Sequence, residues 1–93
     1  MKEITFNNFY QLYQKESLSV LDVREVEEFE ALHLEGARNF PLSQLADTYE
    51  QLDKTQPYYV ICKYGIRSAH ACQFLTEKGY DVINVPAGVD AFE

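Results

Sequence analysis

The chain is organised around one stretch, Val60-Ile61-Cys62-Lys63-Tyr64-Gly65-Ile66-Arg67-Ser68-Ala69, in which an apolar β run ends in a cysteine, turns through a glycine and opens a helix. A parallel strand carries its last residue to the carboxyl edge of the sheet, where open α/β folds bind ligands. The first residues of a helix present backbone N–H groups that attract anions. We therefore expect a small anion site beside Cys62. The helix start, with Lys63 and Arg67, favours the thiolate, which is the nucleophilic form of cysteine.

Length and composition predict a single domain over residues 1–93. The 46% hydrophobic fraction is ordinary for a globular core, and the apolar runs are too short to cross a bilayer. The N-terminal residues lack the apolar region of a secretory signal, so we expect a cytoplasmic protein with no membrane partner. Cys62 and Cys72 are too few for a disulfide framework, and with His33 and His70 they show no recognised zinc spacing. We expect reduced thiols and no metal.

Charge is unevenly distributed along the chain. The net charge of −7 argues against a nucleic acid partner, because phosphates would be repelled. From Lys54 through Thr76, however, there is no Asp or Glu, whereas Lys54, Lys63 and Arg67 are cationic. The cysteine segment is therefore expected to be a locally basic region that can receive a small anion.

Strand and helix patterns alternate along the sequence. Strands are predicted at 19–23, 37–40, 58–61 and 81–85, and helices from Phe6 after a Thr5 cap, over 24–31, from Pro41 towards Leu52, and from Ile66 to about Lys78 before a Gly79 cap. This alternation indicates an α/β fold with a mostly parallel sheet and helices on both faces. Val26 and Phe29 are expected on the inner face of the acidic helix, with its carboxylates in solvent. Cys72 is expected in the core.

The spacing within the loop bears on what it can bind. Four residues separate Cys62 from Arg67, one fewer than in the Cys-x5-Arg loop that wraps a tetrahedral phosphate in cysteine phosphatases. The shorter loop is expected to suit a single sulfur atom better than a phosphoryl group. Gly65 is expected to allow a backbone angle or a close approach that a Cβ would forbid. Ser68 is interpreted either as a partner of the loop and its bound species or as a structural cap.

These residues resemble those of a known family, the single-domain rhodaneses, which are sulfurtransferases. The stretches 21–25, 28–29 and 33–42 are similar to the family's first motif, LDVRE…EF…GHIxGAxNIP, and residues 62–68 are similar to its active-site loop. Residues 87–92 resemble the closing GGxxAW, although this chain has Ala87 in place of a glycine and Phe92 in place of the tryptophan. The resemblance covers nearly the whole chain.

The resemblance implies a rhodanese-like, five-stranded fold and a ping-pong sulfur transfer that needs no cofactor. Cys62 is then the catalytic nucleophile, which takes a sulfur atom from a small anion such as thiosulfate and passes the persulfide sulfur to a thiol, a protein acceptor or cyanide. Substrate binding is expected from the remaining loop residues, Lys63, Tyr64, Gly65, Ile66, Arg67 and Ser68. Asp22, Arg24 and His33 are interpreted as structural ties behind the loop.

Two other functions stay open at this point. A phosphatase or arsenate reductase of the same fold would also use a cysteine loop, but the Cys-x4-Arg spacing favours sulfur. A non-catalytic binding module of the same fold would not need Cys62 together with Gly65, Arg67 and Ser68. The sequence leaves the physiological donor, the acceptor and the oligomeric state undetermined.

Overall fold

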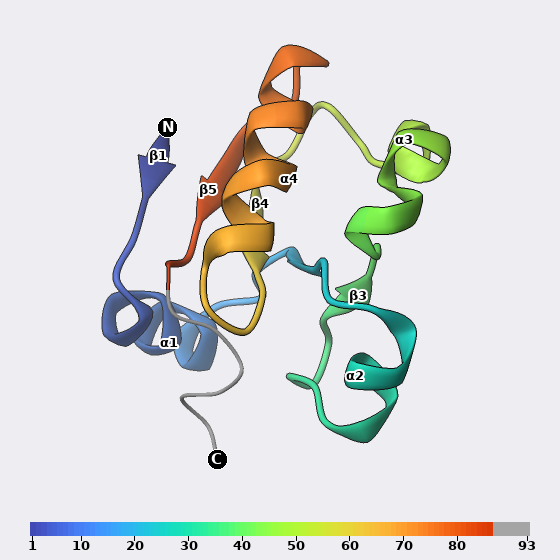
Figure 1. The fold of residues 1–93 in the computed structure, drawn as a ribbon. Helices are drawn as coiled ribbons and strands as arrows, with labels where there is room; N and C mark the ends of the chain where they lie inside the picture. Colours follow the sequence, from blue (N-terminus) through green and yellow to red (C-terminus); the bar gives the residue numbers. More distant parts are fainter. Residues whose placement is uncertain (87–93) are drawn as a thin grey trace.

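Five strands form one sheet in the order β1-β5-β4-β2-β3, and every neighbouring pair is parallel. The computed structural model describes residues 1–86. The strands are β1 (Lys2–Glu3), β2 (Val20–Asp22), β3 (Arg38–Asn39), β4 (Tyr58–Ile61) and β5 (Val82–Asn84). The predicted α/β fold with a five-stranded parallel sheet is thereby confirmed, and β4 occupies its centre (Figure 1).

Helices cover both faces of the sheet because strand residues alternate between two apolar clusters. Leu21 and Val60 point to the face where they pack with residues of α3 (Leu45–Thr48) and α4 (Ile66–Glu77). Val20 and Ile61 point the other way, to the face covered by α1 (Phe6–Lys15). Figure 1 shows α4 crossing in front of β4, with α1 at the lower left. The apolar residues of β2 and β4 are thus buried on both faces of the sheet, as in other parallel sheets.

Local signals in the sequence account for the ends of the long helices. The Thr5 hydroxyl accepts a hydrogen bond from the N–H of Asn8 at 3.2 Å, which confirms the predicted cap of α1. Helix α4 begins directly after the loop and ends before Gly79, whose φ of 92° is the left-handed conformation of a C-terminal glycine cap.

The acidic helix α2 (Val26–Ala31) begins later than predicted, and its packing differs from the expectation. Glu25 is its N-cap and forms a capping box with Glu28, which leaves Arg24 outside the helix. The prediction that Val26 lies on an inner face is wrong, since this side chain is 38% exposed, and Phe29 is only partly buried. Helix α2 has no fully buried residue, so hydrogen bonds hold it more than core packing does.

The segment after Pro41 is a broken helix. It consists of a 3-10 turn (η1, Leu42–Gln44), the single α-helical turn of α3 and a second 3-10 turn (η2, Tyr49–Gln51). Helical turns thus occur where the helix was predicted, but they do not form one continuous α-helix. The predicted turn after Pro86 and the family-like segment 87–92 lie outside the described residues.

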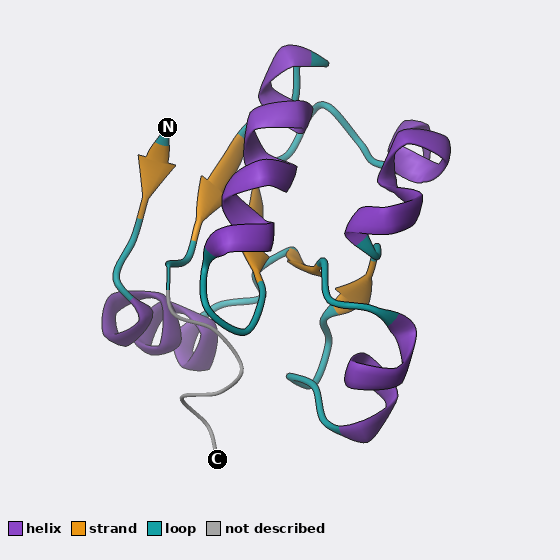
Figure 2. Ribbon diagram, in the orientation of Figure 1, coloured by secondary structure: helices purple, strands orange, loops and turns teal. Residues whose placement is uncertain are grey.

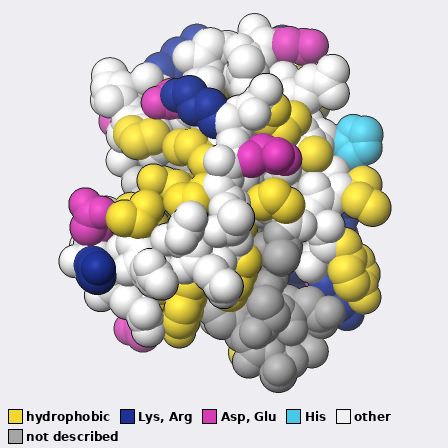
Figure 3. Space-filling model, turned by 90° about the vertical axis from the view of Figure 1, so that its left-hand side faces the viewer, with side chains coloured by type: hydrophobic (Ala, Val, Ile, Leu, Met, Phe, Trp, Pro, Cys, Tyr) yellow, Lys and Arg dark blue, Asp and Glu magenta, His cyan; other side chains and the backbone are white. Residues whose placement is uncertain are grey.

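Figure 2 shows that loops join the strands to the helices at the lower edge of the sheet, including the turn between β4 and α4. The face nearest β1 and α1 carries Lys/Arg and Asp/Glu side chains interspersed with hydrophobic ones (Figure 3). The charge on that face is therefore mixed in sign despite the net charge of −7. Within residues 1–86, no helix has the length and apolar character needed to cross a membrane.

Candidate active site

Cys62 lies directly after β4, at the carboxyl end of the central strand, where the sequence places it. Its side chain is only 1% exposed and belongs to the apolar cluster beneath α4. The thiol is therefore recessed below the loop.

Three hydrogen bonds converge on the Cys62 sulfur. The backbone N–H of Gly65 donates to Sγ at 3.1 Å, and the N–H of Ser68 donates to it at 3.2 Å. The thiol in turn donates to the Ser68 hydroxyl at 3.3 Å. Hydrogen bonds from N–H groups favour the ionised form of their acceptor, so the loop and the first turn of α4 form a cradle suited to an anionic sulfur.

Gly65 allows this cradle to close. Its φ of 87° lies in the left-handed region that residues with a Cβ rarely adopt. A Cβ at this position would also overlap the backbone carbonyl of Pro86, the residue that follows β5 and Val85. Both reasons predicted for this glycine, a special backbone angle and a close approach, are confirmed.

Two side chains of the loop lie at the protein surface. Tyr64 and Ile66 are 68% and 67% exposed and form an apolar rim around the recessed thiol. The Lys63 ammonium lies 5.5 Å from the centre of the Tyr64 ring, within cation–π range. The Cys62 sulfur therefore contacts the loop through the N–H groups of Gly65 and Ser68 and the Ser68 hydroxyl, while the side chains of Tyr64 and Ile66 are presented to an approaching molecule.

Arg67 is engaged by a carboxylate from another helix. Its guanidinium donates two hydrogen bonds to Glu28, at 2.5 and 3.0 Å, in a bidentate ion pair. The bond from Arg67 lowers the pKa of Glu28 to about 2, and the same bond raises the pKa of Arg67. We expected the acidic side chains of 24–31 to be solvated, but Glu28 instead neutralises the charge of the loop arginine.

A buried ion pair supports the neighbouring strand end. Asp22 is fully buried and accepts hydrogen bonds from the Arg24 side chain at 2.8 to 3.1 Å. The Asn39 amide donates to the backbone oxygens of both residues, at 3.0 and 2.9 Å. These bonds fix the chain between β2 and α2, so Asp22 and Arg24 act as structural ties, as expected.

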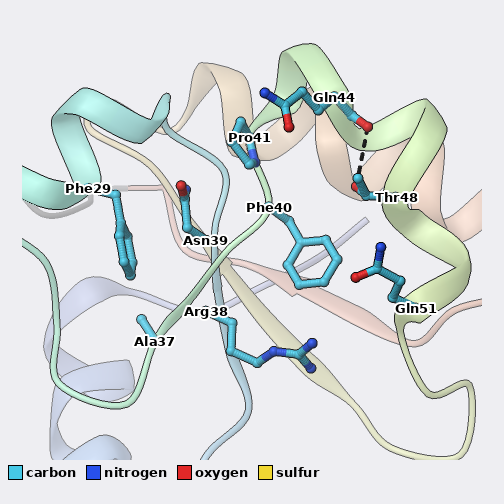
Figure 4. Close-up of a pocket in the computed structure, with 9 residues that line it drawn as sticks. All are labelled: Phe29, Ala37, Arg38, Asn39, Phe40, Pro41, Gln44, Thr48 and Gln51. Carbon is cyan, nitrogen blue, oxygen red and sulfur yellow. Dashed lines mark hydrogen bonds between the residues drawn. The ribbon is translucent and has the colours of Figure 1, made fainter.

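A groove lies along the outer strand β3 (Figure 4). Its volume is about 370 Å³, and it is lined by Phe29, Ala37, Arg38, Asn39, Phe40, Pro41, Gln44, Thr48 and Gln51. None of residues 62–68 lines it. His33 stacks on Phe29 with ring centres 3.8 Å apart, so it supports α2 and does not tie the loop. His70 is exposed on α4.

Cys72 lies in the core, on helix α4, which follows the cysteine loop. Its side chain is fully buried on the inner face of α4, and burial raises the pKa of its thiol to about 12. It remains a protonated thiol at neutral pH. The prediction that Cys72 is a core residue is confirmed.

The predicted site residues therefore divide into two groups. Cys62, Gly65 and Ser68 meet at the sulfur, whereas the side chains of Lys63, Tyr64 and Ile66 form the outer surface and Arg67 turns to α2. Sequence reasoning missed Glu28 as a neighbour of the loop. The spacing of Glu25 and Glu28 carries a helix-start signal, but nothing local in the sequence reveals a partner 39 residues away.

No group of three or more His, Cys, Asp or Glu side chains among residues 1–86 is arranged to hold a metal ion. A buried thiol whose sulfur accepts two backbone N–H groups is an arrangement that can act as a nucleophile and form a covalent intermediate.

Comparison with known proteins matches residues 5–93 to the family model described as "Rhodanese-like domain". The uncharacterized protein YqhL of Bacillus subtilis is 39% identical over 95% of this chain and 69% of its own length. The thiosulfate sulfurtransferase GlpE of Shewanella oneidensis is 33% identical over 98% of this chain and 91% of its own. The crystal structure of SSP1007 from Staphylococcus saprophyticus superposes with a TM-score of 0.93 at 30% identity, over 100% of this chain and 94% of that one.

Proposed function

The chain belongs to the rhodanese-like domain family, and on that premise we propose that it is a sulfurtransferase that carries a sulfane sulfur on Cys62 as a persulfide. The sulfur donor is a small anion such as thiosulfate, and the acceptor is a thiol, a protein thiol or, in the test tube, cyanide. A relative named as a thiosulfate sulfurtransferase supports this choice of chemistry. A reduced Cys62 requires a reducing compartment, which for this proposal is the cytoplasm.

The proposed reaction has two displacement steps. The Cys62 thiolate attacks the outer sulfur of thiosulfate, the S–S bond of the donor breaks, and sulfite leaves with the electron pair. Cys62 then carries the terminal sulfur as a persulfide anion. A nucleophilic acceptor attacks this terminal sulfur, the persulfide S–S bond breaks, and the Cys62 thiolate is regenerated. No external oxidant or reductant is consumed.

One observation carries the proposal most: the N–H groups of Gly65 and Ser68 both point at the Cys62 sulfur. They stabilise the thiolate before attack and after release of the sulfur. During the persulfide stage the negative charge lies on the terminal sulfur, and the loop N–H groups from Lys63 to Arg67 are the proposed donors to it. The Ser68 hydroxyl, 3.3 Å from Sγ, supplies a further polar contact.

The single-atom tip of a sulfane sulfur also fits the recessed position of Cys62, which is 1% exposed. A phosphoryl group would have to bring three equatorial oxygens into the same cradle. The Arg67 guanidinium, which such a group would require, is bound to Glu28. These features favour sulfur transfer over hydrolysis of a phosphate ester.

The proposal is tested by the intact mass of the reduced protein before and after incubation with thiosulfate, and again after cyanide. We expect a gain of one sulfur atom that cyanide removes with release of thiocyanate. Cys62→Ser should take up no sulfur, because the hydroxyl is not a comparable nucleophile. The matched control is Cys72→Ser, which removes the other cysteine and should still take up one sulfur.

Sulfur uptake that persists in Cys62→Ser would contradict the proposed nucleophile. Absence of uptake from thiosulfate and from organic persulfides in the wild-type protein would contradict the sulfurtransferase itself. Turnover of an aryl phosphate by the same protein would then favour the phosphatase.

A further inference from the structure

The ion pair between Arg67 and Glu28 cancels the positive charge that Arg67 brings to the loop. The two bonds between Arg67 and Glu28 join the first turn of α4 to α2, and both side chains are about one-third exposed, 32% and 34%. Paired charges of opposite sign cancel at a distance. An incoming anion therefore meets little net attraction from Arg67.

The carboxylate of Glu28 is fixed in this position. Its Oε1 also accepts the backbone N–H of Glu25 at 3.1 Å, as part of the capping box that starts α2. The side chain of Glu25 is itself held by the Ser43 hydroxyl at 2.6 Å. Glu28 is thus anchored from two sides, by α4 and by its own helix, and it can remain on Arg67 while the loop reacts.

We propose that Glu28 tunes the charge preference for the sulfur donor, so that its pairing with Arg67 lowers the advantage of dianions such as thiosulfate relative to donors with one negative charge or none. This inference rests on the proposed sulfur transfer and names its substrate class. It is supported by the loop rim, where the exposed Tyr64 and Ile66 offer apolar contact to an organic donor or to a persulfide on another protein. The Lys63 ammonium, over the Tyr64 ring, attracts an anion equally in all variants described below.

Two small sulfur donors that differ in charge but react in the same way test this proposal. Thiosulfate carries two negative charges and methanethiosulfonate carries one, and both transfer a terminal sulfur to Cys62. The leaving group is sulfite for the first and methanesulfinate for the second, and each departs with the electron pair of the broken S–S bond. Their intrinsic reactivities differ, so the quantity compared is the ratio of variant to wild-type kcat/KM for each probe.

Glu28→Gln removes one negative charge and keeps a side-chain oxygen for Arg67 and for the N–H of Glu25. The guanidinium then has an uncompensated charge, and its attraction for a donor scales with the charge of the donor. We expect kcat/KM to rise about fivefold for thiosulfate and about twofold for methanethiosulfonate, with both gains declining as salt is added. The matched control is Glu27→Gln, an identical change at the exposed neighbour on the same helix, which should alter both values by less than about 1.5-fold.

The double variant Glu28→Gln/Arg67→Gln separates charge from direct contact. It replaces a neutral ion pair with a neutral pair of amides, so the relative preference for the two probes should return to that of the wild-type protein. It also introduces no uncompensated charge, and it serves as the test if Glu28→Gln alone does not fold. If Arg67 instead binds the donor directly, the double variant will lose thiosulfate more than methanethiosulfonate.

Equal changes for both probes in Glu28→Gln, or changes matched by Glu27→Gln, would overturn the role of Glu28. The Cys62 persulfide would still form in that case, and the sulfurtransferase would stand. Failure of the wild-type protein to take up sulfur from either probe would instead overturn the proposed function. The two failures are therefore distinguishable by mass spectrometry.

Discussion

The two cysteines of this chain are both buried, ten residues apart, yet they lie in opposite environments. Cys62 is 1% exposed and receives two backbone N–H groups on its sulfur. Cys72 is fully buried in the middle of α4, and the removal of solvent raises the pKa of its thiol to about 12. Both sulfur atoms belong to the same apolar cluster.

The difference teaches that burial alone does not decide the chemistry of a cysteine. Within a helix, backbone N–H groups are already bonded to carbonyls, so none is available to Cys72. At a strand end before a helix start, the N–H groups have no helical partner and can turn to a side chain. Cys62 therefore lies in a polar cradle within an otherwise apolar core.

The largest expected effect comes from disrupting the cradle at Gly65. Gly65→Ala forces a Cβ against the Pro86 carbonyl at a φ of 87°, and we expect a loss of about 3 kcal/mol in unfolding free energy and at least a hundredfold in Cys62 sulfur uptake. Gly36→Ala is the matched control, since Gly36 has a φ of 86° but nothing within 4 Å of the added Cβ. It should cost about 1 kcal/mol and leave uptake unchanged. Equal losses in both variants would contradict the close packing of the loop.

Exchange of sulfur for oxygen compares the two cysteines directly. Cys72→Ser places a hydroxyl among apolar side chains, and we expect it to cost about 2 kcal/mol of stability in urea unfolding. Cys62→Ser should cost less than about 1 kcal/mol, because the Gly65 and Ser68 N–H groups can donate to the new hydroxyl. A larger loss at position 62 than at position 72 would reverse the contrast between the two environments.

The Ser68 side chain tests how much of the cradle is backbone. Ser68→Ala keeps the N–H that donates to Sγ and removes only the hydroxyl at 3.3 Å. We expect the rate of sulfur uptake from thiosulfate to fall about threefold to tenfold, with the fold intact. The rate is measured from the intact mass of samples quenched at successive times. No change in rate would show that the backbone N–H groups suffice, and complete loss would assign the hydroxyl the leading role.

The smallest effect is expected at the ion pair between Arg67 and Glu28, which lies near solvent. The pKa of Glu28 is lowered from 4.5 to about 2 in the folded protein, so its contribution to stability is present above pH 4.5 and is lost as the pH falls from 4.5 towards 2. Because the side chain is 34% exposed, screening limits that contribution to about 0.5 kcal/mol.

Urea unfolding at pH 7 and pH 3 measures this contribution. The decline in stability between the two pH values should be smaller in Glu28→Gln than in the wild-type protein and in Glu27→Gln. An identical decline in all three proteins would show that the Arg67 pair contributes nothing to stability. The packing of the core around Cys72 is expected to stay the same between pH 7 and pH 3.

Four of the five strands in residues 1–86, the long helices and the cysteine loop could be predicted because each depends on local order in the sequence, whereas β1 (Lys2–Glu3) is too short to leave a pattern. The apolar run before Cys62, the cap at Thr5 and the glycine after α4 are short-range signals, and the structure agrees with all three. The position of α2 was predicted to within two residues, but the prediction of how it packs was wrong. Its apolar residues suggested a buried face, although hydrogen bonds of Glu25 and Glu28 hold it at the surface.

The sequence by itself determined that this is a parallel α/β protein with Cys62 at a strand end, since hydrophobic period and turn chemistry are local properties of the chain. Only the tertiary structure decided what surrounds that cysteine. Glu28 reaches Arg67 across 39 residues, and Pro86 closes on Gly65 from the end of β5. These contacts arise when the strands are ordered in the sheet, and their geometry depends on distances in space that no spacing along the chain encodes.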